Sequence, residues 1–170
     1  MRQPKVFRVA VTVAGLAAGI VHAEEAEKGK PMSGVARGSF EVKVAPAAEE
    51  KFPDGTALGR YTLAKTIQGD IEGTSRGEML TGGTPVEGSA GYVAIERVEG
   101  TLHGRRGSFL LQHLGKMTKA GGYLMEITVV PDSGTGELAG LSGRFEILFV
   151  EKRHDYRFEY TLEAPGSTVR

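Results

Sequence analysis

Apolar and polar residues alternate along most of the chain after Gly34. The stretch SFEVKV places Phe40, Val42 and Val44 on one side of an extended segment and charged residues on the other, which is the two-residue period of a half-buried strand. The pattern recurs in 91–102, 107–117, 122–130, 143–150 and 154–163. We therefore expect an all-β domain of about eight strands with short connections, an antiparallel barrel or sandwich.

Two segments before residue 70 interrupt this alternation. APAAEEKFPDG, residues 45–55, is predicted to be a loop with one helical turn ahead of Pro53. RYTLAKTI then places Tyr61, Leu63 and Ile67 on alternate positions, with Lys65 breaking the apolar series.

Several strands carry apolar residues on both faces, as in YVAI, residues 92–95. A small barrel needs only one apolar face, so the second face predicts another buried surface, most simply a contact between subunits. A homo-oligomer is therefore one expectation from the sequence.

The N-terminal segment has the pattern of a secretory signal peptide. Three basic residues in 1–8 precede an apolar run from Val9 to Val21, and VHA at 21–23 supplies the small residues that a signal peptidase reads. The run is too short for a membrane-spanning helix. We expect a signal peptide at 1–23, a disordered leader at 24–33, the barrel domain at 34–163 and a flexible tail at 164–170. The expected location is the bacterial periplasm or the cell exterior.

Composition narrows the classes of partner. Cleavage after residue 23 would remove three of the 21 basic residues and no acid, leaving 18 basic and 21 acidic residues, a formal charge of −3. Nucleic-acid binding would need a clustered basic face, so it is not expected. The chain has no cysteine, so disulfides cannot stabilise the exported protein.

The glycine-rich stretch VVPDSGTGELAGLSGRF, residues 129–145, raises the question of phosphate binding. Gly134 and Gly136 fit the first two positions of a G-x-G-x-x-G fingerprint, but the third falls on Ala139. Such a loop must also lead into a helix, whereas the following GRFEILFV alternates like a strand. We interpret the stretch as a turn between strands and expect no cofactor.

The same turn carries a family resemblance. The stretches LGRYTLAKTIQGDIEGTSRGEML, GSAGYVAIERVEGTLHGRRGSFLLQH and TVVPDSGTGELAGL resemble a bacterial domain-of-unknown-function family with an allene oxide cyclase-like barrel, distantly similar to plant allene oxide cyclases and dirigent proteins. The resemblance implies a single eight-stranded antiparallel barrel, often oligomeric, with a cavity for a small, largely apolar molecule. It carries over no catalytic residue.

Two residues are the main candidates for chemistry inside the barrel. His113 lies in phase with Phe109 and Leu111, and Glu96 lies in phase with Tyr92 and Ala94. His113 is either a core histidine bonded to the backbone or a lumen group that orients a ligand or moves a proton. Glu96 faces either the lumen, where it needs a partner or a raised pKa, or the exterior. Alternation alone does not identify the inner face.

Three further residues complete the set of ligand-binding candidates. Tyr92 belongs to the same strand as Glu96, and Glu72 belongs to a polar side of residues 70–78 that is either a solvent face or a cavity wall. Tyr160 belongs to an aromatic series on the last strand that either packs the core or lines a pocket. The histidines lack metal-ligand spacing, so no metal site is predicted.

Three classes of function remain open. The first is an exported barrel that binds a small apolar or amphipathic molecule. The second is a cofactor-free isomerase or cyclase of the allene oxide cyclase type, in which proximity supplies most of the rate. The third is a structural or assembly protein. A lumen in which His113 and Glu96 converge would favour catalysis, and a filled barrel would favour the structural role.

Overall fold

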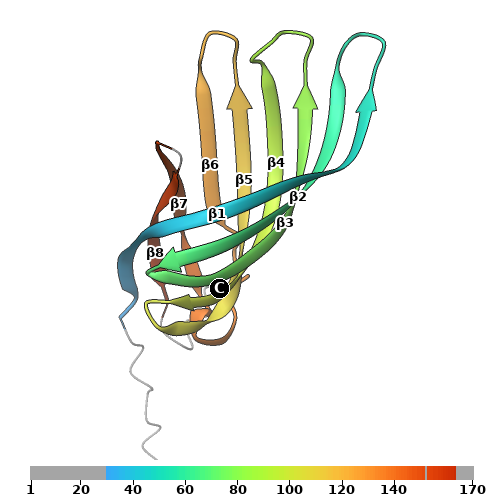
Figure 1. Cartoon of the computed structure of the whole chain (residues 1–170). Helices are drawn as coiled ribbons and strands as arrows, with labels where there is room; N and C mark the ends of the chain where they lie inside the picture. Colours follow the sequence, from blue (N-terminus) through green and yellow to red (C-terminus); the bar gives the residue numbers. More distant parts are fainter. Residues whose placement is uncertain (1–29, 152, 164–170) are drawn as a thin grey trace, which may run out of the picture.

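Eight antiparallel strands account for nearly all of the chain that the structure describes, residues 30–151 and 153–163 of a computed structural model (Figure 1). The predicted signal peptide and the predicted tail lie outside these residues. The strands are β1 Met32–Lys51, β2 Ala57–Gly69, β3 Ile71–Gly83, β4 Ala90–Leu102, β5 Arg105–Met117, β6 Tyr123–Val129, β7 Leu141–Val150 and β8 Arg153–Leu162. β1 thus begins inside the segment 24–33 that the sequence assigned to a leader. No helix in the described ranges is both long and apolar enough to cross a membrane.

Each strand pairs with the next, and β8 returns to pair with β1, so the sheet is a closed barrel. The expected all-β, antiparallel eight-stranded barrel is confirmed. β1 closes it because its first part pairs with β8, from Met32 to Phe40, and its later part pairs with β2, from Gly38 to Lys51. The ladder between β6 and β7 consists of a single pair, Thr128 with Arg144.

Residues 45–55 are not the loop with a helical turn that their composition predicts, because β1 continues to Lys51. Ala45–Lys51 pair with the start of β2, with a bulge between Pro46 and Ala48. Proline lacks the N–H that a central strand would need, but β8 pairs with β1 only as far as Phe40. Among the described residues, one edge of β1 is therefore unpaired at Pro46, and a proline is tolerated there.

The glycine-rich stretch connects β6 to β7, as the sequence predicts for a turn between strands. The loop contains one turn of 3₁₀ helix, Gly136–Leu138. β6 pairs with β5 only from Leu111 to Met117, and the loop lies beside the first part of β5, which β6 does not reach. The Thr135 N–H donates to the Ser108 carbonyl at 2.8 Å, and the Leu110 N–H donates to Ser133 Oγ at 3.0 Å. Gly136 has φ +60°, a left-handed conformation in which a side chain is disfavoured.

Aromatic and aliphatic side chains fill one end of the barrel. Phe109 lies 5.8 Å from Phe158 between ring centroids, and Phe145 lies 5.2 Å from Tyr156. Leu138 of the 3₁₀ turn is only 1% exposed and packs into the same core. This end, which we call the closed end, is therefore packed with side chains.

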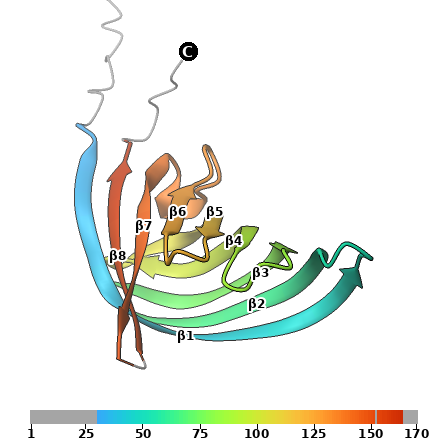
Figure 2. The same cartoon turned by 90° about the horizontal axis from the view of Figure 1, so that it is seen from above.

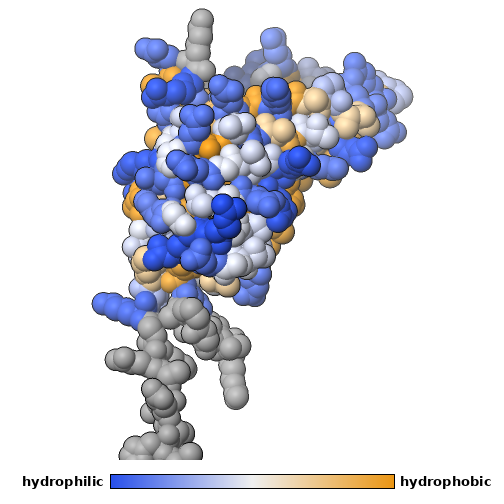
Figure 3. Space-filling view, turned by 60° about the horizontal axis from the view of Figure 1, so that its bottom comes forward, coloured by the Kyte–Doolittle hydropathy of each residue, from blue (hydrophilic) through white to orange (hydrophobic). Residues whose placement is uncertain are grey.

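The other end is open. The β1–β2, β3–β4 and β5–β6 hairpins project away from the closed end, all in the same direction (Figure 1). Seen from above, the strands curve around one inner surface (Figure 2). Strand register places Tyr61, Met79, Tyr92, Met117 and Tyr123 on this inner surface, and all are at least partly exposed. We call these five residues the concave face. When the bottom of the molecule in Figure 1 is turned forward, the side that faces the viewer is mainly hydrophilic, with scattered hydrophobic residues (Figure 3).

Candidate functional site

Four polar side chains from neighbouring strands point into the barrel. They are Lys65 on β2, Ser75 on β3, Glu96 on β4 and His113 on β5, and each is buried. Each occupies an inner position because side chains alternate between the two faces of a strand. Glu96, for example, lies between buried Ala94 and Val98, whereas its immediate neighbours are exposed. The strands thus bring together residues that are far apart in the chain.

The Glu96 carboxylate is the centre of this cluster. Lys65 Nζ donates to Glu96 Oε2 at 2.7 Å, and the Ser75 hydroxyl donates to Oε1. His113 Nε2 lies 3.1 Å from Oε2. Lys65 also lies over the Phe40 ring, 4.7 Å from its centroid, where a cation is attracted to the aromatic face. Glu96 itself is 0% exposed.

The partners of Glu96 determine its charge. Burial by itself raises the pKa of the carboxyl, but the contacts with His113, Lys65 and Ser75 together outweigh burial and lower the pKa to about 2. Glu96 is therefore ionised at neutral pH, paired with the Lys65 ammonium. A buried charge is tolerated when an opposite charge and hydrogen bonds compensate for its lost hydration.

His113 is the member of the cluster whose polar atom is not fully satisfied. Its Nε2 is within hydrogen-bond distance of Glu96, yet the ring geometry does not align an N–H with the carboxylate, and Nε2 has no hydrogen-bond partner in the described part of the chain. The contact is therefore mainly electrostatic. A buried polar atom in this state calls for an explanation, of which a role in chemistry is one.

The cluster lies between the packed closed end and the concave face. On β4, Val98 and Leu102 continue from Glu96 into the closed end, while Ala94 and Tyr92 continue from it toward the open end. Tyr92 lies flat against Gly115, where a Cβ would overlap its ring. Burial, with a smaller effect of Tyr123, raises the pKa of Tyr92 to about 12, so its phenol stays protonated.

The structure brings together two of the five residues proposed from the sequence, Glu96 and His113, and places Tyr92 on the neighbouring concave face. Glu72 is on the outer surface of β3 and exposed, which corresponds to the solvent-face interpretation. Tyr160 is buried at the closed end, stacked 5.5 Å from Phe158, which corresponds to core packing.

Sequence reasoning missed Lys65 and Ser75. Lys65 looked like an interruption of an apolar face, although it is in phase with Leu63 and Ile67, both of which are buried. A charged residue in phase with core residues is a usable signal, because it must find a partner inside. Ser75 carried no comparable signal. The described residues contain no group of three or more metal-ligating side chains.

The fold and this cluster define a small antiparallel β-barrel protein with a buried ionic centre. The chain belongs to the DUF3224 family, described as a protein of unknown function, whose family model matches residues 36–160. A crystal structure of a DUF3224 protein of unknown function from Shewanella oneidensis MR-1 is 46% identical, with a TM-score of 0.72, over 78% of this chain and 99% of that one. No curated protein matches the chain.

Proposed function

We propose that the concave face binds a small apolar or amphipathic molecule whose polar end reaches the buried cluster. The observation that carries this proposal is the ionised Glu96, held by Lys65 and Ser75 beneath an apolar inner surface. Replacing such a group by apolar residues often leaves stability unchanged or raises it. Its presence is therefore better explained by a role in recognition or chemistry, as is common for buried groups with strongly shifted pKa values.

The chemistry of the surroundings suits an amphipathic ligand. Tyr61, Met79 and Tyr92 offer aromatic and thioether surface for an apolar body. Lys65 and His113 lie beneath them, and an ammonium or an imidazole N–H can donate to an acceptor oxygen of a ligand. Because the closed end is filled with side chains, the ligand would occupy the open end.

Titration with 1-anilinonaphthalene-8-sulfonate, an apolar ring system with an anionic group, tests this proposal through its fluorescence. Binding should weaken at least tenfold in Lys65→Met and stay unchanged in Glu72→Gln, which alters an exposed carboxyl on the outer surface. Val93→Lys places a charge among exposed apolar residues on the outer surface of β4. A loss of fluorescence in this variant would show that the probe binds to that outer surface. A probe lost in Val93→Lys but retained in Lys65→Met would contradict the proposal. Native mass spectrometry of protein purified from its host would identify the class of any co-purified molecule.

We infer a second candidate, a cofactor-free isomerase or cyclase, from the approach of His113 to Glu96. A carboxylate beside an imidazole favours a proton on the facing nitrogen, Nε2, and leaves the lone pair of Nδ1 free. His113 would then accept a proton from a carbon acid and return it at another position. Glu96 would stabilise the imidazolium, and Lys65 would keep Glu96 ionised.

Exchange of α-protons for deuterium in 2-phenylcyclohexanone, an apolar enolisable ketone, provides the assay for this second candidate. NMR should show exchange that depends on the protein and is lost in His113→Gln. It should persist in His103→Gln, because His103 is an exposed turn residue. Exchange that is equal in both variants would exclude His113 as the base.

We also propose that the protein is exported. The support is the basic, apolar and small-residue pattern of residues 1–23. Expression of the full chain in a bacterium and mass spectrometry of the periplasmic fraction should find a mature chain that begins at Glu24. A full-length chain confined to the cytoplasm would contradict export.

A further inference from the structure

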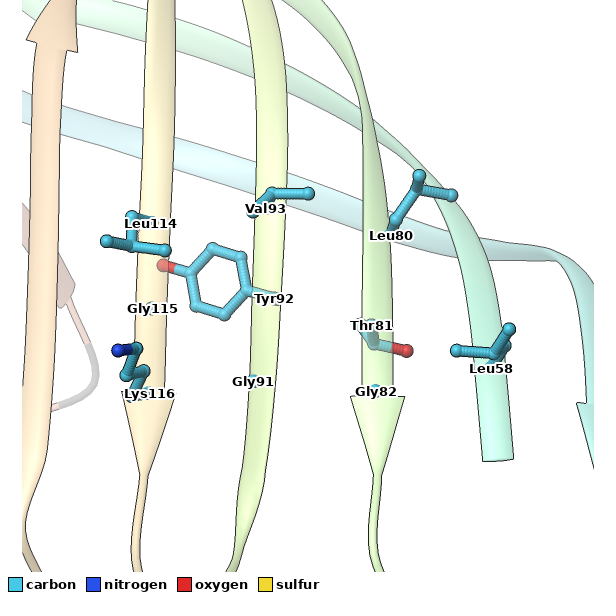
Figure 4. Close-up of a pocket in the computed structure, with 10 residues that line it drawn as sticks. All are labelled: Leu58, Leu80, Thr81, Gly82, Gly91, Tyr92, Val93, Leu114, Gly115 and Lys116. Atoms are coloured by element: carbon cyan, nitrogen blue, oxygen red, sulfur yellow. The ribbon is translucent and has the colours of Figure 1, made fainter. Parts of the chain in front are cut away.

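The outer surface of β2–β5 carries a contiguous apolar patch near the open end, made by Leu58, Leu80, Val93, Ile95 and Leu114. The first four are 56%, 55%, 50% and 47% exposed. Strand register places Leu80 opposite Val93, and Val93 opposite Leu114. Two shallow grooves of about 370 and 440 Å³ lie on this patch, and Figure 4 shows four of its residues around the first groove. Contiguous exposed apolar surface of this kind marks an interaction site.

We propose that this patch is the contact surface for a second copy of the chain, related by a two-fold axis that runs along β4. The support is the order of residues across the strands. One row reads Arg60, Leu80, Val93, Leu114 and Glu126 from β2 to β6. It begins with a cation, ends with an anion, and is apolar in between.

A two-fold axis along β4 lays this row over its own reverse. Arg60 then faces Glu126 of the second copy, Leu80 faces Leu114, and Val93 faces its own equivalent. An isologous interface requires this kind of self-complementarity, because the same surface must satisfy itself. Opposite charges at the ends also favour this register over one in which like charges meet.

The next row toward the hairpin loops obeys the same rule. It reads Leu58, Gly82, Gly91, Lys116 and Leu124. Reversal places Leu58 over Leu124 of the second copy, both of them exposed apolar residues. Lys116 falls over Gly82, where a side chain would meet no atom within 4 Å of its Cβ, so the long lysine has room.

The row through Ile95, on the side toward the closed end, also places compatible side chains opposite each other when it is reversed. In this row Ile95 lies on the axis, and Glu78 faces Gln112 of the second copy. The Glu78 carboxylate can accept a hydrogen bond from the Gln112 amide. The row after it limits the contact, because there Arg97 occupies the axis and would face its own equivalent, which is repulsive. The interface is therefore confined to the open halves of the strands, where β4, β5 and β6 run nearly straight (Figure 1). This inference is independent of the proposed ligand site.

A cysteine cross-link tests the position of the axis, because the chain has no cysteine of its own. Val93→Cys should form a covalent dimer with a short bis-maleimide cross-linker, because face-packed sheets lie about 10 Å apart, too far for a direct disulfide. Thr74→Cys, an exposed position on the outer surface of β3 away from the axis, should stay monomeric under the same conditions. Cross-linking that is equal in both variants, or absent from Val93→Cys, would overturn the proposed axis.

Charge reversal tests the register and avoids changes to the apolar patch. Sedimentation equilibrium should give the wild type twice the mass of the chain. Arg60→Glu and Glu126→Arg should each weaken the dimer at least tenfold, because like charges then meet, and the double variant should recover most of the affinity. Circular dichroism checks that each variant folds. A wild type that is monomeric at every concentration, or single reversals without effect, would refute the interface.

Discussion

Replacing Glu96 with glutamine removes the charge at the centre of the cluster while keeping the size of the side chain. The pKa of Glu96 falls from its ordinary value of 4.5 to about 2 in the folded protein. A carboxyl whose pKa is lower in the folded state stabilises the fold above its unfolded pKa, and this stabilisation is lost as pH falls through the folded pKa. The shift corresponds to about 3 kcal/mol. Glu96→Gln should therefore lower the free energy of unfolding by about 3 kcal/mol at neutral pH.

Urea unfolding followed by far-ultraviolet circular dichroism measures this difference. The gap between the wild type and Glu96→Gln should shrink as pH falls from 4.5 to 2, because the protonated wild type then resembles the variant. Glu72→Gln is the matched control, since an exposed carboxyl should change stability by no more than about 0.5 kcal/mol. A Glu96→Gln effect below about 1 kcal/mol, or a gap that does not depend on pH, would refute the reasoning.

The remaining predictions concern the supports of the cluster and of the barrel. Lys65→Met should cost about 3–5 kcal/mol by leaving Glu96 unpaired, and the double variant Lys65→Met/Glu96→Gln should recover much of that loss; urea unfolding of all three variants completes the cycle. Gly115→Ala should displace the Tyr92 ring and cost about 1–3 kcal/mol, with a change in near-ultraviolet circular dichroism as its local signature. Leu138→Ala should cost about 2–5 kcal/mol by opening a cavity at the closed end. A loss under about 1 kcal/mol in thermal unfolding would show that the loop does not seal the core.

The alternation of residues was sufficient for the class of fold, because the side-chain period of a strand is a local property. It also predicted that the glycine-rich stretch connects two strands. It failed at residues 45–55, where Pro46, Ala47 and Ala48 look like a loop when read locally. Their extended conformation comes from pairing with β2, and Pro46 is tolerated because no other described strand pairs with β1 beyond Phe40 on its second edge. Both are properties of the sheet.

The sequence by itself determined the all-β class, most of the strands, the turn and a short set of polar residues in phase with the core. The tertiary structure decided which of those residues meet. Glu96 finds Lys65 and Ser75 because the register of the paired strands β2, β3 and β4 places the three side chains next to one another on one face, and closure of the sheet makes that face the interior. The same closure places Glu72 outside and Tyr160 in the packed end. A strand's period assigns residues to two faces, and only the closed sheet decides which face is buried and which side chains converge there.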